Sequence, residues 1–296
     1  MADNARSAKP WLLAARPKTL AAAVTPVLVG TALAFRDLAT IHWSSLLFAL
    51  LGAVFIQIGT NYVNDALDFK KGADTQARLG PLRVTQAGLL SAEAVLRGAY
   101  IWFFLAALCG IPLILRGGWP IAAIGIASIV AAYAYTGGPY PLAYQGLGEV
   151  FVMIFFGFVA VCGSFYLQRL TLDPTAWLGG FAVGSLAVVI LAINNLRDIE
   201  NDRASNKRTL AARFGPTFAY AEIMLFALAP FLSVAVIAYL RRSPALAIPM
   251  LALIPALALL LRVARSRGAE LNRCLALAGA LEWSFGILYV LGAAVG

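Results

Sequence analysis

The sequence predicts an all-α membrane protein in which nine helices cross the bilayer. Hydrophobic residues make up 61% of the 296 positions, whereas charged residues make up only 12%. A soluble domain is about 45–50% apolar and roughly 25% charged, so this composition excludes an ordinary soluble fold and a disordered chain. The apolar residues form long unbroken runs, which are typical of membrane-spanning helices and not of the short alternating strands of a membrane barrel.

A helix needs about 20 mostly apolar residues to span a bilayer. We expect a single integral membrane domain over residues 1–296, in which the polar and basic residues 1–18 form a cytoplasmic N-terminal segment. A span is predicted wherever an apolar run lies between more polar connections. In chain order the nine predicted spans are Thr19–Phe35, Ser45–Val63, Val95–Leu115, Trp119–Thr136, Leu147–Leu167, Ala176–Leu196, Phe218–Leu240, Ala245–Arg262 and Cys274–Val295.

The basic residues indicate how these spans are oriented. With the N-terminus inside, 18 of the 23 Lys and Arg residues fall on the cytoplasmic side. Cytoplasmic loops of membrane proteins carry such an excess, so we expect a cytoplasmic N-terminus and an external C-terminus. The same excess accounts for the net charge of +9 without nucleic-acid binding. The five basic residues on the outer side are Arg36, Arg116, Arg169, Arg241 and Arg242.

Two long polar connections, after the second and sixth spans, carry acidic clusters on the cytoplasmic side. Within each cluster, acidic and amide side chains recur four residues apart, which places them on one face of a helix. Carboxylates so placed repel each other unless a cation lies between them. Because no His or Cys is nearby, the donors suit a hard cation such as Mg²⁺, and two facing clusters would clamp a magnesium-bound diphosphate. The first cluster comprises Asn61, Asn64, Asp65, Asp68 and Asp74, and the second Asn194, Asp198, Glu200 and Asp202.

Basic residues beside both clusters support an anionic ligand, because Lys, Arg and metal ions stabilise a departing diphosphate. Two alternatives remain open. The clusters can be polar helix ends in the headgroup region, or the ion pathway of a cation-coupled carrier. Their place at helix ends on one side favours an interfacial active site. The basic residues concerned are Lys70, Lys71, Arg78 and Arg83 in the first connection, and Arg203, Lys207 and Arg208 in the second.

At these clusters the sequence resembles the UbiA superfamily of intramembrane aromatic prenyltransferases. The matching motifs are Asn64-Asp65-x-x-Asp68 and Asp198-x-x-x-Asp202. The chain is most similar to the 1,4-dihydroxy-2-naphthoate polyprenyltransferase branch of menaquinone synthesis, over roughly residues 11–215. The stretches that carry this resemblance are 15–20, 68–74, 80–83, 137–142, 146–149, 163–166 and 194–210.

The resemblance implies a UbiA-like helical bundle with two Asp-rich cytoplasmic loops, in a bacterial inner membrane. It implies a Mg²⁺-dependent transfer of the prenyl group from polyprenyl diphosphate to 1,4-dihydroxy-2-naphthoate. Carbon dioxide and diphosphate leave, and demethylmenaquinone results. A 4-hydroxybenzoate polyprenyltransferase of ubiquinone synthesis and a phytyl-transferring homologue are the alternatives within the family. The Tyr-x-x-x-Lys segment of the 4-hydroxybenzoate branch is replaced by Tyr135-Thr-Gly-Gly-Pro139, which disfavours that alternative.

The resemblance also implies roles for individual residues. Asp65, Asp68, Asp198 and Asp202 are the expected catalytic residues. Interfacial anchoring is the alternative role of Arg16 and Lys18, and a solvated helix start is the alternative for Glu149. The expected metal ligands are Asn64, Asp65, Asp68, Asp74, Asn194, Asp198 and Asp202. The expected substrate-binding residues are Arg16, Lys18, Asn61, Lys71, Arg83, Tyr135, Glu149, Lys207 and Arg208. Aromatic rings that would stabilise an allylic cation, or simply pack, are those of Tyr62, Phe151, Phe155 and Tyr166.

Overall fold

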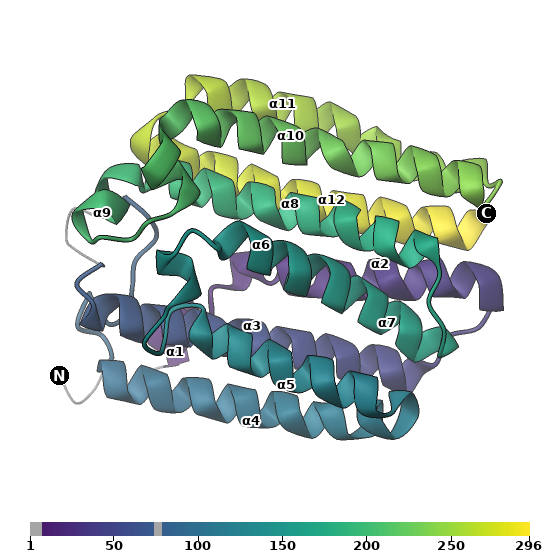
Figure 1. Cartoon of the computed structure of the whole chain (residues 1–296), viewed down its shortest axis with the longest axis horizontal. Helices are drawn as coiled ribbons and strands as arrows, with labels where there is room; N and C mark the ends of the chain where they lie inside the picture. Colours follow the sequence, from purple (N-terminus) through teal and green to yellow (C-terminus); the bar gives the residue numbers. More distant parts are fainter. Residues whose placement is uncertain (1–7, 74–78) are drawn as a thin grey trace.

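The computed structural model describes residues 8–73 and 79–296, and within these ranges its regular elements are all helical. The long helices run roughly parallel along the longest dimension of the molecule (Figure 1). In chain order the elements are α1 Ala8–Ala15, η2 Pro17–Thr19, α2 Ala21–Leu38, α3 Trp43–Lys70, α4 Ala92–Gly117, α5 Trp119–Ala134, η3 Leu142–Tyr144, α6 Gly148–Val152, η4 Met153–Val159, α7 Ala160–Arg169, α8 Pro174–Arg197, α9 Ile199–Ala204, α10 Leu210–Leu240, η5 Pro244–Ala252, α11 Leu253–Arg265, η6 Gly268–Glu270 and α12 Leu271–Val295.

The predicted all-α class is confirmed, and each of the nine apolar runs coincides largely with helix. Among the described residues, seven helices are long and apolar enough to cross a membrane. The count is eight if α1 and η2 form one span with α2, from which they are bent by 48°. Helix α5 has only 16 residues, fewer than the roughly 20 of a usual span. By length and composition alone, the described helices therefore provide fewer than the nine predicted spans.

The polar connections are shorter than the sequence predicts. We expected the first to begin at Asn64, but α3 continues to Lys70 and carries Asp65 and Asp68 in its last turns. The second was expected to run from Arg197 to about position 217, but it contains α9, and α10 begins at Leu210. The expectation of an Asp-rich loop is therefore wrong for Asp65 and Asp68, which are helical. The polar residues continue the helix because their side chains find partners in neighbouring segments.

Small residues bring the centre of the bundle close together. Between α6 and α7 the helix widens into the π-helical segment η4. A Cβ atom on Gly157 of η4 would lie 2.5 Å from the Gly180 carbonyl oxygen of α8, and one on Gly184 would lie 2.9 Å from the Gly157 Cα. Such contacts let membrane helices approach closely. Helix α8 is largely buried among the other helices.

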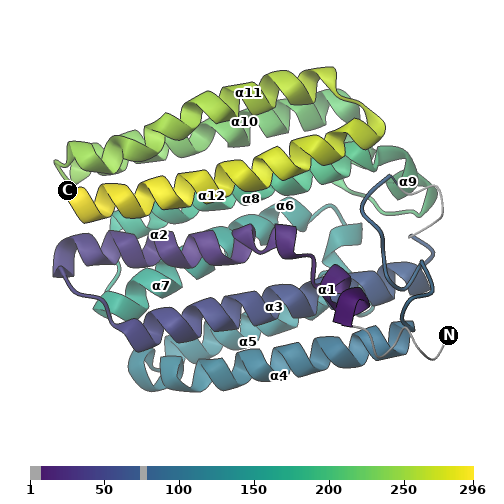
Figure 2. The ribbon, with the colours of Figure 1, turned by 180° about the vertical axis from the view of Figure 1, so that it is seen from behind.

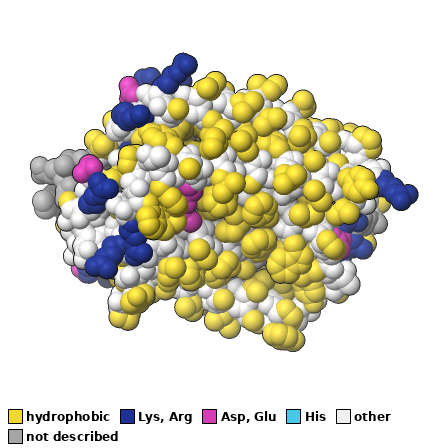
Figure 3. All heavy atoms as spheres, turned by 45° about the horizontal axis from the view of Figure 1, so that its top comes forward, with side chains coloured by type: hydrophobic (Ala, Val, Ile, Leu, Met, Phe, Trp, Pro, Cys, Tyr) yellow, Lys and Arg dark blue, Asp and Glu magenta, His cyan; other side chains and the backbone are white. Residues whose placement is uncertain are grey.

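The two ends of the bundle differ. Figure 3 shows a broad belt of hydrophobic side chains with Lys and Arg at both ends, most of them at the end that holds α9 in Figure 1. Seen from behind in Figure 2, α1 lies beside α3 at this same end, and α12 ends at the opposite one. The end with α1 and α9 also receives the C-terminal turns of α3 and α8. Both acidic clusters therefore lie at one end of the belt.

Candidate functional site

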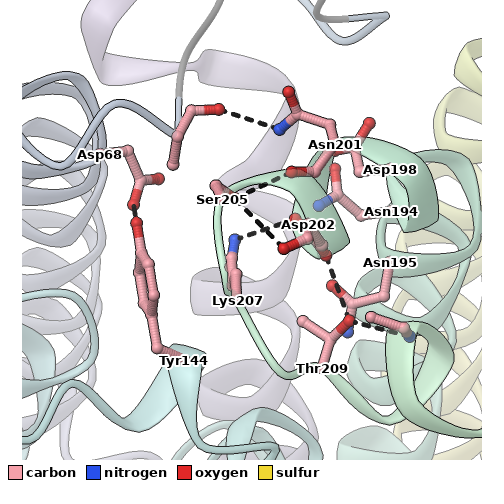
Figure 4. Close-up of polar contacts among 12 residues, drawn as sticks. Asp68, Tyr144, Asn194, Asn195, Asp198, Asn201, Asp202, Ser205, Lys207 and Thr209 are labelled. Atoms are coloured by element: carbon pink, nitrogen blue, oxygen red, sulfur yellow. Dashed lines mark hydrogen bonds and ion pairs between the residues drawn. The ribbon is translucent and has the colours of Figure 1, made fainter.

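The two acidic clusters meet although 130 residues separate them in sequence. Asn201 in α9 donates a hydrogen bond from Nδ2 to the Ala73 carbonyl oxygen, at 2.9 Å (Figure 4). Asp68 of the first cluster lies near enough to Asp202 of the second for its charge to act on that carboxyl group. The structure therefore brings the two clusters to one site.

The first cluster is held by the segment that follows it. Asp65 is buried and accepts hydrogen bonds from the Val84 amide at 3.2 Å, the Thr85 amide at 2.9 Å and the Thr85 hydroxyl. Asp68 accepts one from the Arg83 guanidinium at 3.2 Å. The chain between α3 and α4 thus folds back onto the acidic end of α3. It supplies Arg83, which was predicted to bind substrate and here donates to Asp68.

The asparagines of the first cluster tie it to two other segments. Asn61 Nδ2 donates to the Ala15 carbonyl oxygen and to Thr19 Oγ1, both at 3.0 Å. Asn64 Oδ1 accepts a hydrogen bond from Thr136, which follows α5. Asn61 therefore positions residues 15–19.

Residues 15–19 form the bend between α1 and α2. Arg16 is half-buried there and has left-handed backbone angles, φ 50° and ψ 67°. That conformation costs a residue with a side chain about 1–2 kcal/mol. Strain of this kind is often found at functional sites. Lys18 is exposed, one residue before the Asn61 partner Thr19.

The second cluster is organised by an arginine. Arg197 donates to both carboxylate oxygens of Asp198 and, at 2.7 Å, to Asn194 Oδ1. Asp202 accepts from the Thr209 hydroxyl at 3.1 Å and lies 3.9 Å from Lys207 Nζ. Asn194 and Asp198 thus share one guanidinium.

Burial and neighbouring charges both act on Asp202. Burial raises the pKa of Asp202 to about 6. Lys207 opposes this effect, whereas the charges of Asp198 and Asp68 add to it. A buried carboxyl group loses the water that stabilises its charged form. A cation bound between Asp202 and Asp68 would offset that cost.

Two lysines, one from each connection, lie near the same aromatic ring. Lys71 Nζ donates to the Thr136 carbonyl oxygen at 2.6 Å and lies 4.7 Å from the centre of the Tyr144 ring. Lys207 Nζ lies 5.6 Å from the same centre. Burial lowers the pKa of Lys71 from its usual value, and the charge of Asp68 partly offsets this.

The remaining basic residues of the two connections point elsewhere. Lys70 forms an ion pair with Glu93 at 2.7 Å, and Arg203 pairs with Glu200 at 3.4 Å. The Arg208 side chain is exposed, and its backbone amide donates to the Tyr144 carbonyl oxygen at 3.1 Å. The structure therefore brings Arg208 to the site through its backbone.

An apolar cavity of about 420 Å³ begins at the acidic site and runs into the bundle. Asn61, Asn64 and Tyr135 line it at the acidic end, and Ile121 and Leu167 line it near the opposite end of the helices. It lies between α2, α3, α4, α5 and the span formed by α6, η4 and α7. The cavity thus joins a polar mouth to a hydrophobic interior.

Of the four aromatic candidates, two line this cavity. Phe151 and Phe155 do so, with their rings stacked at 6.0 Å. Tyr62 instead donates to the Trp11 carbonyl oxygen at 2.9 Å, and Tyr166 donates to that of Gly117 at 3.2 Å. The positions of Tyr62 and Tyr166 indicate packing.

Tyr135 lines the cavity and lies near both acidic clusters and Glu149. The negative charges of Glu149, Asp68 and Asp202 all act on the Tyr135 hydroxyl. Glu149 is buried and accepts a hydrogen bond from Asn195 Nδ2 at 2.8 Å. The predicted alternative of a solvated helix start for Glu149 is therefore wrong, because neighbouring helices cover it.

The donor set fits a magnesium ion. No three acidic, His or Cys side chains among the described residues are close enough to form a preformed metal cage. Magnesium usually takes one or two carboxylates and completes its shell with water and phosphate oxygens, so it needs no such cage. Asp68 and Asp202 offer carboxylate oxygens to one site from two different helices, α3 and α9. Asp74 and Arg78, also expected here, lie outside the described residues.

Several residues of the site escaped the sequence analysis. Tyr144 donates a hydrogen bond to Asp68 at 2.9 Å, and Arg197 organises the second cluster. Arg197 stands directly before Asp198, which was a usable signal. Thr85 and Tyr144 reach acids 20 and 76 residues away, and local spacing contains no information on such contacts.

Comparison with known sequences gives consistent matches. The sequence profile of the UbiA prenyltransferase family matches residues 23–288. The chain is 42% identical over 213 residues to 1,4-dihydroxy-2-naphthoate octaprenyltransferase of Escherichia coli (strain K12). This alignment covers 69% of the chain and 68% of the Escherichia coli protein. The chain is also 38% identical over 247 residues to the Haemophilus influenzae protein of the same name. That alignment covers 81% of the chain and 79% of the Haemophilus influenzae protein.

Solved structures share the fold. A UbiA homologue from Aeropyrum pernix K1 superposes with a TM-score of 0.68 at 15% identity, covering 92% of this chain and 97% of that one. A UbiA homologue from Archaeoglobus fulgidus bound to DMAPP and Mg²⁺ gives a TM-score of 0.63 at 15% identity, covering 95% and 98%. At this identity the likeness concerns the helical architecture.

Proposed function

Because the chain belongs to the UbiA prenyltransferase family, we propose that it transfers a polyprenyl group from polyprenyl diphosphate to 1,4-dihydroxy-2-naphthoate. The observation that carries the proposal is the junction of two facing acidic clusters with the mouth of an apolar cavity. A polyprenyl diphosphate has the same division, a charged head on a long hydrophobic tail. The relatives named for this reaction support the choice of acceptor.

The chain's own residues bind and orient the donor substrate. Lys71 and Lys207 contact the diphosphate oxygens, and Arg83 keeps Asp68 in place. The cavity receives the prenyl tail and excludes water from the allylic carbon. Phe151 and Phe155 present their rings to a cation that develops there.

Magnesium is the proposed cofactor. Asp68 and Asp202 would hold it, with Asp65, Asp198, Asn64 and Asn194 nearby and Asp74 as a further proposed ligand. Bound at this place, Mg²⁺ supplies Lewis-acid stabilisation of the negative charge on the departing diphosphate.

The proposed reaction exchanges one bond for another at each substrate. The carbon–oxygen bond to diphosphate breaks, and the ring carbon that bears the carboxylate forms a bond to the prenyl group. Carbon dioxide leaves from that ring carbon, and the product is the reduced form of demethylmenaquinone. We assign the orientation of the ring to Tyr135 and Glu149. Binding of the entering carboxylate is assigned to Arg16 and Lys18, whose segment is hydrogen-bonded to the cavity-lining Asn61.

We also propose nine spans, with the N-terminus and the active site on the cytoplasmic side of the inner membrane of a bacterium. Helix α5 packs along α3 and α4, which supports its role as a short span (Figure 1). The concentration of basic residues at the end with the acidic clusters supports the orientation.

The experiment is a prenyl-transfer assay with the purified protein in detergent. Radiolabelled 1,4-dihydroxy-2-naphthoate or 4-hydroxybenzoate is mixed with polyprenyl diphosphate and Mg²⁺, and lipid-soluble product is extracted. We expect product from the naphthoate, loss of activity in excess chelator, and recovery when Mg²⁺ is restored. Product from 4-hydroxybenzoate alone would overturn the acceptor, and undiminished turnover in chelator would overturn the cofactor. No product from either acceptor in the presence of Mg²⁺ would overturn the enzyme and favour a carrier.

A further inference from the structure

The segment between α5 and α6 contacts both acidic clusters. Its short helix η3 ends at Tyr144, whose backbone carbonyl oxygen accepts from the Arg208 amide at 3.1 Å. Gly146 has a φ of +73°, and a Cβ atom there would lie 2.9 Å from the Arg208 carbonyl oxygen. Only glycine combines this backbone conformation with so close an approach. The segment is therefore fixed to the chain that leaves the second cluster.

The Tyr144 side chain extends from this segment to the first cluster. Its ring is buried, and its hydroxyl donates to Asp68 Oδ1 at 2.9 Å, while Arg83 binds Asp68 Oδ2. Figure 4 shows the Tyr144 hydroxyl pointing toward Asp68, with Lys207 between Tyr144 and Asp202. Both oxygens of Asp68 are thus held from outside α3.

The same ring is near one lysine from each cluster. Lys71, three residues after Asp68, lies 4.7 Å from the ring centre, and Lys207, five residues after Asp202, lies 5.6 Å from it. Ammonium groups within about 6 Å of an aromatic ring are attracted to its face. Two like charges would otherwise repel, so the ring helps to keep both near the acidic site.

We propose that Tyr144 is a positioning residue that links the two halves of the diphosphate site. Its hydroxyl orients the Asp68 carboxylate toward the cation, and its ring sets Lys71 and Lys207 for the diphosphate. This proposal rests on the proposed function. The hydroxyl orients Asp68 and the ring positions the two lysines, so substitutions that remove only the hydroxyl or the whole ring can distinguish the two roles.

The test measures binding directly, with Mn²⁺ as a spectroscopic substitute for Mg²⁺ and inorganic pyrophosphate as the anion. Tyr144→Phe keeps the ring and loses the hydroxyl. We expect it to weaken Mn²⁺ binding about tenfold in electron paramagnetic resonance titrations, as changes beside metal ligands commonly do. Its affinity for pyrophosphate at saturating Mn²⁺ should stay within about twofold of the wild type. The KM for prenyl diphosphate at saturating Mg²⁺ should then also be near the wild-type value.

Tyr144→Leu removes the ring as well. It should weaken pyrophosphate binding by a further factor of about five, because both lysines lose the aromatic face. Tyr140→Phe and Tyr140→Leu are the matched controls, because Tyr140 lies in the same segment and is 67% exposed. Neither control should change either affinity. Retention of wild-type melting temperature by Tyr144→Phe shows that its effect is local.

The outcomes separate the two levels of the proposal. Wild-type Mn²⁺ binding by Tyr144→Phe would overturn the positioning role while leaving the proposed function intact. Equal losses of both affinities in Tyr144→Phe and Tyr144→Leu would overturn the division between hydroxyl and ring. Failure of the wild-type protein to bind Mn²⁺ with pyrophosphate would overturn the proposed function, and the role of Tyr144 with it.

Discussion

Three carboxylates of the acidic clusters depend on donors from the connecting segments. Asp65 accepts from Thr85, Asp68 from Tyr144, and Asp202 from Thr209. Burial of a carboxylate without such partners costs free energy, because its hydrogen bonds to water are lost and none replaces them. The connecting segments therefore stabilise the acids at the edge of the hydrophobic belt.

Asp65 has the most complete set of donors, and we expect it to contribute to stability. Thr85→Val removes one hydroxyl donor and keeps the shape of the side chain. Hydrogen bonds to charged groups contribute about 1.5–3 kcal/mol, so the free energy of unfolding in detergent should fall by about 2 kcal/mol. The measurement is denaturant unfolding of the purified variant.

Thr171→Val is the control for this substitution, because position 171 lies in the exposed turn between α7 and α8. It should change stability by less than about 0.5 kcal/mol. If both variants unfolded at the same denaturant concentration as the wild type, the bond from Thr85 to Asp65 would have no stabilising role.

Helix α3 shows what hydropathy predicts and what it misses. The apolar run Ser45–Val63 lies within the helix, because a span must pair its backbone groups internally. The helix nevertheless continues to Lys70, since the polar side chains of its last turns find partners from other segments. These partners are distant in sequence, so the apolar pattern indicates where the span lies and not where the helix ends.

The helices around the cavity determine which prenyl chains fit. Gly125 in α5 lines the cavity, and a Cβ atom there would meet nothing within 4 Å. Gly125→Leu should fill this space and lower kcat/KM for a long polyprenyl diphosphate about tenfold, as expected for overpacking. The kcat/KM for dimethylallyl diphosphate, whose tail is short, should fall much less.

Ala127→Leu adds similar volume on the exposed face of the same helix. It should leave both kcat/KM values unchanged. Equal losses for the long and the short donor in Gly125→Leu would mean that the cavity does not receive the tail.

The uneven distribution of basic residues predicts the orientation of the whole molecule. Cysteines introduced by Ala87→Cys and Ala204→Cys lie in exposed positions near the acidic clusters, and Thr171→Cys lies at the opposite end. The three native cysteines are buried, so background labelling should be low. In intact cells a membrane-impermeant maleimide should label Thr171→Cys alone. Labelling of Ala87→Cys or Ala204→Cys from outside would reverse the topology.

The sequence predicts the acidic clusters as a unit but does not reveal how they are assembled. The four-residue spacing of Asn64 and Asp68, and of Asp198 and Asp202, indicates shared helix faces and an oxygen-rich site. The approach of the two clusters depends on the packing of α3 against the rest of the bundle. It also depends on Tyr144, whose contact with Asp68 spans 76 residues. Such contacts exist only in the folded molecule.

The central claim is that both clusters hold one magnesium-bound diphosphate, and a double-mutant cycle between Asp68 and Asp202 tests it most directly. Asp68→Asn and Asp202→Asn should each lower the rate of prenylated product formation about 100-fold, as the loss of a group that supports a metal does. Residues that act as one unit show losses that do not multiply. The double variant should therefore remain near the 100-fold loss of either single one. A loss of about 10,000-fold, the product of the two single losses, would show that the clusters act independently and would contradict the shared site.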